Sequence, residues 1–221
     1  SSHPLNTWVG PVAVGGLLLV AVPYYIRRFS KYQGSKDSLL VSVSWAFIGA
    51  IFGEVFFILS TYEPQMNLFF ISVLGAVTYG LGTLEKKITL LALPCKGVGA
   101  IALLYTIVEG TYISTWIRIG ESTMVWWLWL CMLLSLGVAF LVLRRLVLAK
   151  RIESCIGLIP FVVFGCYIVT VSGATPILTS ILFNAYVLVA ALGTFIRGTL
   201  VKKVSLLNSS ILTLIAMFGA R

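Results

Sequence analysis

The sequence predicts an all-α membrane protein, a polytopic bundle of about eight transmembrane helices with its N-terminus outside. Of the 221 residues, 59% are hydrophobic and 10% are charged, whereas soluble domains carry about 25% charged residues. The apolar residues form runs of about 20, the length that crosses about 30 Å of hydrocarbon as a helix. The basic residues gather in the short connections between these runs, a pattern that specifies membrane orientation.

Eight apolar runs have the length of a span, and a count of seven stays open because two of the runs are short. The runs cover residues 8–26, 39–61, 68–84, 88–109, 124–143, 154–172, 176–196 and 204–220. The strict alternation of transmembrane strands does not occur in them. We therefore expect residues 1–221 to form a single transmembrane domain. A start without Met and an end inside an apolar run lead us to expect a fragment or processed form of a longer chain.

The loops predict the orientation of the bundle. With the N-terminus outside, thirteen cations lie in inner loops and two lie on the outer side. The inner set is Arg27, Arg28, Lys31, Lys36, Lys86, Lys87, Arg144, Arg145, Lys150, Arg151, Arg197, Lys202 and Lys203, and the outer set is Arg118 and Arg221. This bias follows the positive-inside rule. It also accounts for the net charge of +9, so we expect no nucleic-acid partner.

Residues suited to catalysis or cofactor binding are few. The chain has one histidine, His3, one aspartate, Asp37, and four cysteines without CxxC spacing. Haem ligation by paired histidines, a histidine-based triad, a zinc site and two-aspartate mechanisms are therefore excluded. No phosphate-binding loop or dinucleotide fingerprint occurs. We expect neither an enzyme nor a cofactor or metal.

Two ionisable residues lie inside predicted spans, Glu54 and Lys96. Such groups are costly in hydrocarbon and are functional candidates for that reason. Their depths differ by about 10 Å at the helical rise of 1.5 Å per residue, and a direct ion pair between them stays open. Gly49 and Gly53 form a GxxxG motif that lets another helix approach closely. Glu54 flanks this seam, either as a hydrogen-bonded structural acid or as a proton- or cation-binding carboxylate.

The stretch LALPCKGVGA, residues 91–100, is irregular for a membrane helix. Pro94 removes a backbone hydrogen bond, and Gly97 and Gly99 loosen the same turn, so we predict a kink. Broken helices near the midplane mark substrate sites in secondary transporters. Pro160 is the nearest analogue of this interruption elsewhere in the chain.

The longest outer loop, TYISTWIRIGEST, has the pattern of a short amphipathic helix. We expect it to lie in the membrane interface, with Trp116 and Ile117 toward lipid and Arg118 and Glu121 toward water. Trp116, Trp126 and Trp127 are predicted interface anchors.

Two further stretches support a family resemblance. One is GAIFGEVFFILSTYEPQMNLFFISVLGAVTYGL, a glycine-rich span with the short break and span that follow it. The other is ILFNAYVLVAALGTFIRGTLVKKVSLLNSSILTLIAMFGAR, in which a span ends in Gly and Arg, a basic turn follows and LLN opens a last span. Both resemble a family of bacterial multi-pass membrane proteins, the domain of unknown function 2157, although its aromatic-and-Gln signature is absent here. The resemblance implies a bacterial inner membrane and no established reaction.

These observations together predict a multi-pass integral membrane protein without catalysis of its own. We expect it to act as a structural, assembly or accessory component of a membrane complex. Its partners would be the lipid bilayer and other membrane-protein subunits or a second copy, contacted through helix packing. A bacterial inner membrane is the predicted location, with an organelle inner membrane left open. The alternative is a small-solute or ion transporter or channel that uses Glu54, Lys96 and the Pro94–Gly99 kink.

Overall fold

A computed structural model describes residues 38–62, 64–84, 89–122, 126–149, 157–202 and 204–219. Within these ranges the secondary structure is helical, with no strand, which confirms the predicted all-α class for the described part. The predicted span 8–26 lies outside the described residues. The elements are α2 (Ser38–Tyr62), the 3₁₀ turn η1 (Pro64–Met66), α3 (Asn67–Leu84), α4 (Thr89–Thr111), α5 (Ile113–Gly120), α6 (Trp126–Leu148), α7 (Ile159–Val171), α8 (Pro176–Leu200) and α9 (Val204–Gly219).

Five of the described helices are long and apolar enough to cross a membrane. They are α2, α3 together with η1, α4, α6 and α8. Two more helices are apolar but shorter, α7 with 13 residues and α9 with 16. A 13-residue helix is only about 20 Å long at 1.5 Å per residue. The chain is thus a membrane-embedded helical protein by the length and composition of its helices.

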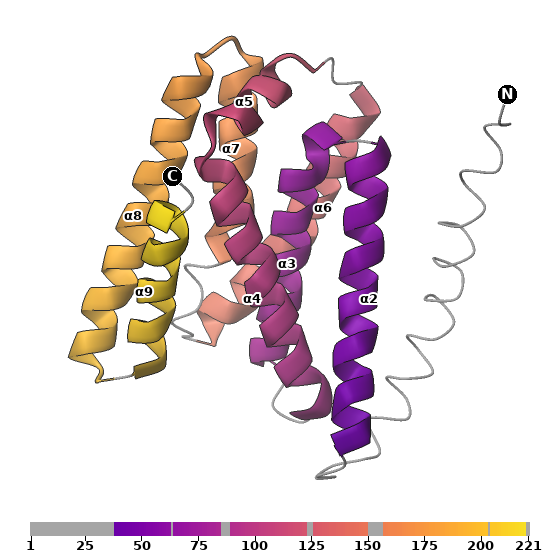
Figure 1. Cartoon of the computed structure of the whole chain (residues 1–221), viewed down its shortest axis with the longest axis vertical. Coiled ribbons are helices and arrows are strands. Elements are labelled where there is room, and N and C mark those ends of the chain that lie inside the picture. The colour runs from indigo at the N-terminus through magenta and orange to yellow at the C-terminus, as the bar shows by residue number, and fades with distance from the viewer. Residues whose placement is uncertain are drawn as a thin grey trace, which may run out of the picture.

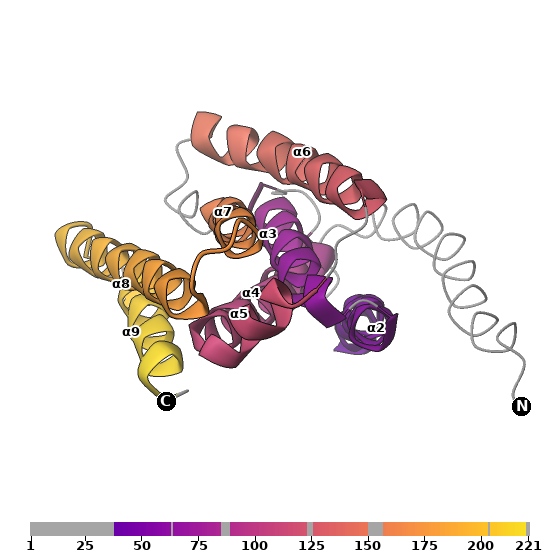
Figure 2. The same cartoon turned by 90° about the horizontal axis from the view of Figure 1, so that it is seen from above.

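The helices are arranged around a central pair, α3 and α4 (Figure 1). α2 packs against α4, α6 and α7 pack against α3, and the α8–α9 pair packs against α4. Viewed from above, α2 and the α8–α9 pair stand at opposite sides of the bundle (Figure 2). The short helix α5 lies across the end of the bundle at which α4 ends, in contact with α7 and α8.

Glycine brings the backbones of α3 and α4 into close contact. A Cβ atom on Gly99 would lie 2.6 Å from the backbone nitrogen of Tyr79 and 2.9 Å from the carbonyl oxygen of Gly75. A Cβ on Gly82 would lie 2.7 Å from the carbonyl oxygen of Ala92. Real Cβ atoms do not approach other atoms so closely, so only glycine fits at these positions. Small residues of this kind let membrane helices approach each other closely. Close packing is needed there, because lipid supplies no hydrophobic force that drives helices together.

Four fully buried rings join the elements beside this pair. They are Phe69 of α3, Trp116 of α5, Tyr167 of α7 and Phe183 of α8. Trp116 lies 6.2 Å from Tyr167 and 5.9 Å from Phe183 between ring centroids, and Phe69 lies 6.2 Å from Tyr167. Aromatic pairs at these separations stabilise a core beyond the area that they bury. The aromatic cluster therefore ties α5 to the bundle.

Substituting Gly99 tests the α3–α4 contact. We expect Gly99→Ala to lower stability by about 1–3 kcal/mol, because the added methyl group overpacks the seam. Thermal unfolding of the purified chain in one detergent measures the effect. The control is Gly165→Ala on α7, where a Cβ meets nothing within 4 Å. Equal melting temperatures for the two variants would contradict the glycine seam.

Candidate functional site

The connection between α4 and α5 is a single residue. Tyr112 is extended, with φ −79° and ψ 130°, and both neighbouring residues are helical. Its backbone N–H donates to Glu109 O at 3.2 Å, and its carbonyl oxygen accepts from Thr115 N at 3.3 Å. The chain therefore turns sharply, and we call residues 105–121 the α4–α5 corner.

The last four carbonyl oxygens of α4 all have hydrogen-bond partners at this corner. The end of an α-helix leaves four such oxygens without intrahelical donors. Two of the partners belong to the turn itself, one is the Trp116 indole, and one is a hydroxyl of α8. The bonds are Thr111 Oγ1 to Val108 O at 2.6 Å, Tyr112 N to Glu109 O at 3.2 Å, Trp116 Nε1 to Gly110 O at 2.8 Å and Ser180 Oγ to Thr111 O at 3.0 Å.

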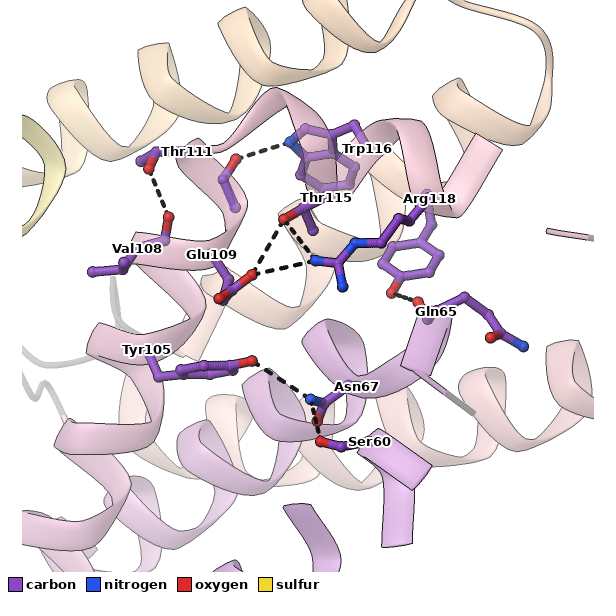
Figure 3. A network of polar contacts seen from close by, with 12 residues as sticks. Ser60, Gln65, Asn67, Tyr105, Val108, Glu109, Thr111, Thr115, Trp116 and Arg118 are labelled. Atoms are coloured by element: carbon purple, nitrogen blue, oxygen red, sulfur yellow. Dashed lines mark hydrogen bonds and ion pairs between the residues drawn. The ribbon is translucent and has the colours of Figure 1, made fainter. Parts of the chain in front are cut away.

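An acid, a hydroxyl and a guanidinium meet between α4 and α5 (Figure 3). Arg118 Nη2 lies 3.6 Å from Glu109 Oε2, and Thr115 Oγ1 donates to the same carboxylate oxygen at 3.2 Å. Arg118 Nη2 also donates to Thr115 Oγ1 at 3.4 Å. The Glu109 side chain is 30% exposed and that of Arg118 is 62% exposed. An ion pair with this exposure contributes little stability, on the order of 0–1 kcal/mol.

A second polar group lies deeper in the bundle, one helical turn along α4. Asn67 Nδ2 donates to Ser60 Oγ at 3.1 Å and to the Tyr105 hydroxyl at 3.5 Å. The Tyr105 ring also packs edge-on against Phe56, with centroids 5.4 Å apart. Residues of α2, α3 and α4 therefore meet directly below the Glu109–Arg118 pair, as Figure 3 shows.

The Asn67 amide is only partly satisfied. The residue is 8% exposed, and its Oδ1 atom accepts no hydrogen bond from the described residues. A buried acceptor without a partner costs about 1–3 kcal/mol. Most buried polar groups in proteins are paired for that reason. Asn67 is thus the point of the network with unused bonding capacity.

This arrangement is a polar clasp formed by Ser60, Asn67, Tyr105, Glu109, Thr115 and Arg118. Among the described residues, no group of three His, Cys, Asp or Glu side chains is placed to hold a metal ion. The clasp supplies hydrogen bonds between α2, α3, α4 and α5 and one ion pair. Its geometry joins four elements at one end of the bundle.

The structure does not join the two ionisable residues predicted from the sequence. Glu54 is partly buried on α2, and Lys96 is partly buried on α4. Within the described ranges the ion pair is that of Arg118 with Glu109, and neither Glu54 nor Lys96 takes part in one. Neither residue lines the groove of about 350 Å³ between α2, α3 and α6 or the cavity of about 70 Å³ between α4, α7, α8 and α9.

The predicted kink residues lie in packing contacts. α4 is helical from Thr89 to Thr111 with Pro94 inside it, and Pro94 is among the fully buried side chains. A Cβ on Gly97 would collide with the Trp45 ring of α2, and Gly99 lies against the α3 backbone. Helix packing therefore explains both glycines.

The predicted packing motif on α2, Gly49 and Gly53, is not covered by another described helix. A Cβ on Gly49 or Gly53 would meet nothing within 4 Å among the described residues. Glycine also forms the α3–α4 seam, although with other spacings, but no described helix occupies this face of α2.

The predicted amphipathic helix exists as α5, but its orientation differs from the prediction. Trp116 is fully buried in the aromatic cluster, so the prediction that it faces lipid is wrong. The cause is that its indole reaches Gly110 O, while Gly110 leaves space that the Phe183 ring fills. Ile117 is 42% exposed, and Arg118 and Glu121 are exposed as expected.

Sequence reasoning missed the α4–α5 corner as a site. Glu109 ends the predicted span 88–109 and Arg118 lies in the predicted outer loop. No sequence pattern pairs these two residues or singles out Asn67, Tyr105 and Thr115. The available signal was an acid followed by Gly110 at the end of an apolar run, with an amphipathic segment carrying Arg118 directly after it.

Comparisons with known proteins add no relative. The chain matches no protein-family model. No curated protein matches it, and no solved structure matches it. The resemblance to the domain of unknown function 2157 therefore stays a prediction.

Replacing Trp116 tests the cap of α4. Trp116→Phe keeps a ring in the core but removes the donor to Gly110 O, and we expect a loss of about 1–3 kcal/mol. Thermal unfolding in detergent measures it. The control is Trp126→Phe, since the Trp126 side chain is 76% exposed. If both variants have the same melting temperature, the hydrogen bond from the Trp116 indole does not stabilise the α4–α5 corner.

Proposed function

We propose that this protein is a multi-pass integral membrane protein without catalysis of its own, which acts as a structural, assembly or accessory component of a membrane complex. The observation that carries the proposal is the open face of α2. Of the helices long enough to span a membrane, α2 has the smallest buried share, 17% of its apolar window against 61% for α3.

Small residues occupy part of the exposed surface of α2, which also carries the bulky side chains of Trp45, Phe56 and Phe57. Ser42, Ala46, Ala50 and Gly53 are exposed on it, and Gly49 lies beside them. The exposed faces of α6 and α8 carry mainly bulky Leu, Ile, Val and Phe side chains instead. Small residues favour helix docking in a membrane, because they allow close backbone contact. Bulky side chains suit contact with lipid. The contrast supports α2 as the helix that receives a partner.

A groove lies on the other side of α2, because its lining residues Val55 and Leu59 are about 200° and 240° around the helix from Gly53 at 100° per residue. It has a volume of about 350 Å³, and its walls come from α2, α3 and α6. The lining residues are Val55, Leu59, Phe70, Val73, Leu74, Val77, Ser135 and Val138. An apolar groove of this kind accepts an apolar side chain or helix edge, which fits a helix-packing partner better than a hydrophilic solute.

The proposal includes a topology of eight crossings with the N-terminus outside, in a bacterial inner membrane. The distribution of cations supports the orientation, and the family resemblance alone supports the bacterial inner membrane. The α4–α5 corner and the turn between α7 and α8 lie at one end of the bundle, and the α8–α9 turn with Val201 and Lys202 lies at the other (Figure 1). By the positive-inside rule the α8–α9 end faces the cytoplasm.

The transport alternative receives less support from the geometry. It requires Glu54, Lys96 and the Pro94–Gly99 segment to share a polar path. Gly97 and Gly99 are in packing contacts, and neither ionisable residue lines the groove or the smaller cavity. The polar residues that do meet, at the α4–α5 corner, bond chiefly to one another.

The assembly proposal predicts a sensitive face on α2. We expect the wild-type chain to migrate as part of a larger complex after mild detergent extraction. Gly49→Leu combined with Gly53→Leu should abolish that complex, while the purified chain keeps its melting temperature. Native gel mobility together with thermal unfolding measures both properties. Gly137→Leu on α6 is the matched control, because a Cβ there also meets nothing within 4 Å. A complex that survives the α2 double variant would overturn the proposal.

The topology is tested by cysteine labelling in intact cells with a membrane-impermeant maleimide. Glu121→Cys and Ser172→Cys should react from outside, and Val201→Cys should react only after permeabilisation. All three positions are exposed, whereas Cys95 and Cys131 are partly buried and Cys166 is buried. Reaction of Ser172→Cys from the inner side would mean that α7 does not cross the membrane.

A further inference from the structure

The outward face of α5 is apolar although no described residue covers it. Tyr112 is 40% exposed, Ile113 is 45% exposed and Ile117 is 42% exposed. Ile113 and Ile117 are four residues apart and therefore share one side of the helix. The opposite side, with Thr115, Trp116 and Ile119, is buried in the bundle. Helix α5 is thus apolar on two sides, and only one of them packs against other described residues.

The position of α5 places this face at the membrane surface. The helix lies across the bundle end, directly after the end of α4 (Figures 1 and 2). α6 begins at the same end with Trp126 and Trp127, which are 76% and 44% exposed. Tryptophan is enriched at headgroup depth. Helices with an apolar side at this depth lie in the plane of the interface.

Arg118 provides a cationic group beside the apolar residues. Its side chain is 62% exposed, and only its Nη2 atom contacts Glu109 and Thr115. Its Nε and Nη1 atoms form no hydrogen bond or ion pair with the described residues. A guanidinium with free donors binds phosphate through two parallel hydrogen bonds. The 3.6 Å ion pair with Glu109 leaves this capacity unused.

We propose that the outward face of α5 docks on the membrane surface and that Arg118 binds the phosphate of a lipid headgroup there. Tyr112, Ile113 and Ile117 enter the boundary between headgroups and acyl chains. The site does not depend on a protein partner, so it goes beyond the assembly function. Charge complementarity selects the lipid phosphate, and continuity with the exposed tryptophans at the start of α6 selects the bilayer over a second copy.

The apolar contact is tested by a fluorescent label in vesicles of phosphatidylglycerol and phosphatidylcholine. The label is attached to Ile117→Cys in a full-length chain whose four natural cysteines are alanine and whose melting temperature matches the wild type. We expect a blue-shifted emission and strong quenching by lipids that carry a nitroxide near the headgroup. The control is Ser172→Cys in the exposed turn before α8, where the emission stays water-like. A water-like signal at position 117 refutes the docking, and so does shielding that appears only at high protein density.

The phosphate contact is tested by melting in detergent with added phosphatidylglycerol or with a glycolipid that lacks phosphate. Phosphatidylglycerol should raise the melting temperature of the wild type more than the glycolipid does. In Arg118→Gln the difference between the two increases should fall by at least half. Glu109→Gln removes the ion pair but leaves the guanidinium, so it should keep or enlarge the difference. If Arg118 served only the ion pair, both variants would melt lower in either lipid with the difference unchanged, and that result overturns the proposal. The other cations are common to all three chains and cancel from the comparison.

Discussion

The structure depends on how the end of α4 is satisfied. Hydrocarbon offers no hydrogen-bond partners, so carbonyl oxygens at a helix end near the membrane need partners from the protein. Here Trp116 bonds to Gly110 O and Ser180 bonds to Thr111 O. Because the first donor lies on α5 and the second on α8, capping one helix fixes the positions of two others. The indole then lies against Tyr167 and Phe183, so the cap is also the centre of the aromatic cluster.

Glycine has two opposite uses in this fold. At Gly75, Gly82 and Gly99 it brings two backbones of the same chain into contact. At Gly49 and Gly53 a pair of glycines one turn apart faces open space among the described residues. The packed set shows that this chain builds helix seams from glycine, and the open set has the same chemistry without an occupant. That difference within one molecule is the strongest support for a partner helix at α2.

The sequence was sufficient to locate helices because a membrane imposes one length and one polarity on every span. The runs 39–61, 68–84 and 88–109 match α2, α3 and α4 to within two residues at each end. The run 124–143 was too short because α6 continues as a helix through Arg144 and Arg145 to Leu148. The polar clasp could not be predicted from the sequence, since Asn67 and Tyr105 are far apart in the chain and meet only through helix packing. The burial of Trp116 was also beyond reach, because lipid and protein interior favour the same side chain.

Glu54 lies next to the open face of α2. It follows Gly53 by one residue, about 100° around the helix, so it borders the small-residue face. It makes no hydrogen bond or ion pair with the described residues and is partly buried. A carboxyl group in that position is unfavourable against lipid alone. A helix that packs on Gly49 and Gly53 would cover the acid and bring donors within its reach. One partner would thus account for the glycine pair and for the acid beside it, whereas transport through Glu54 would leave the glycine pair unexplained.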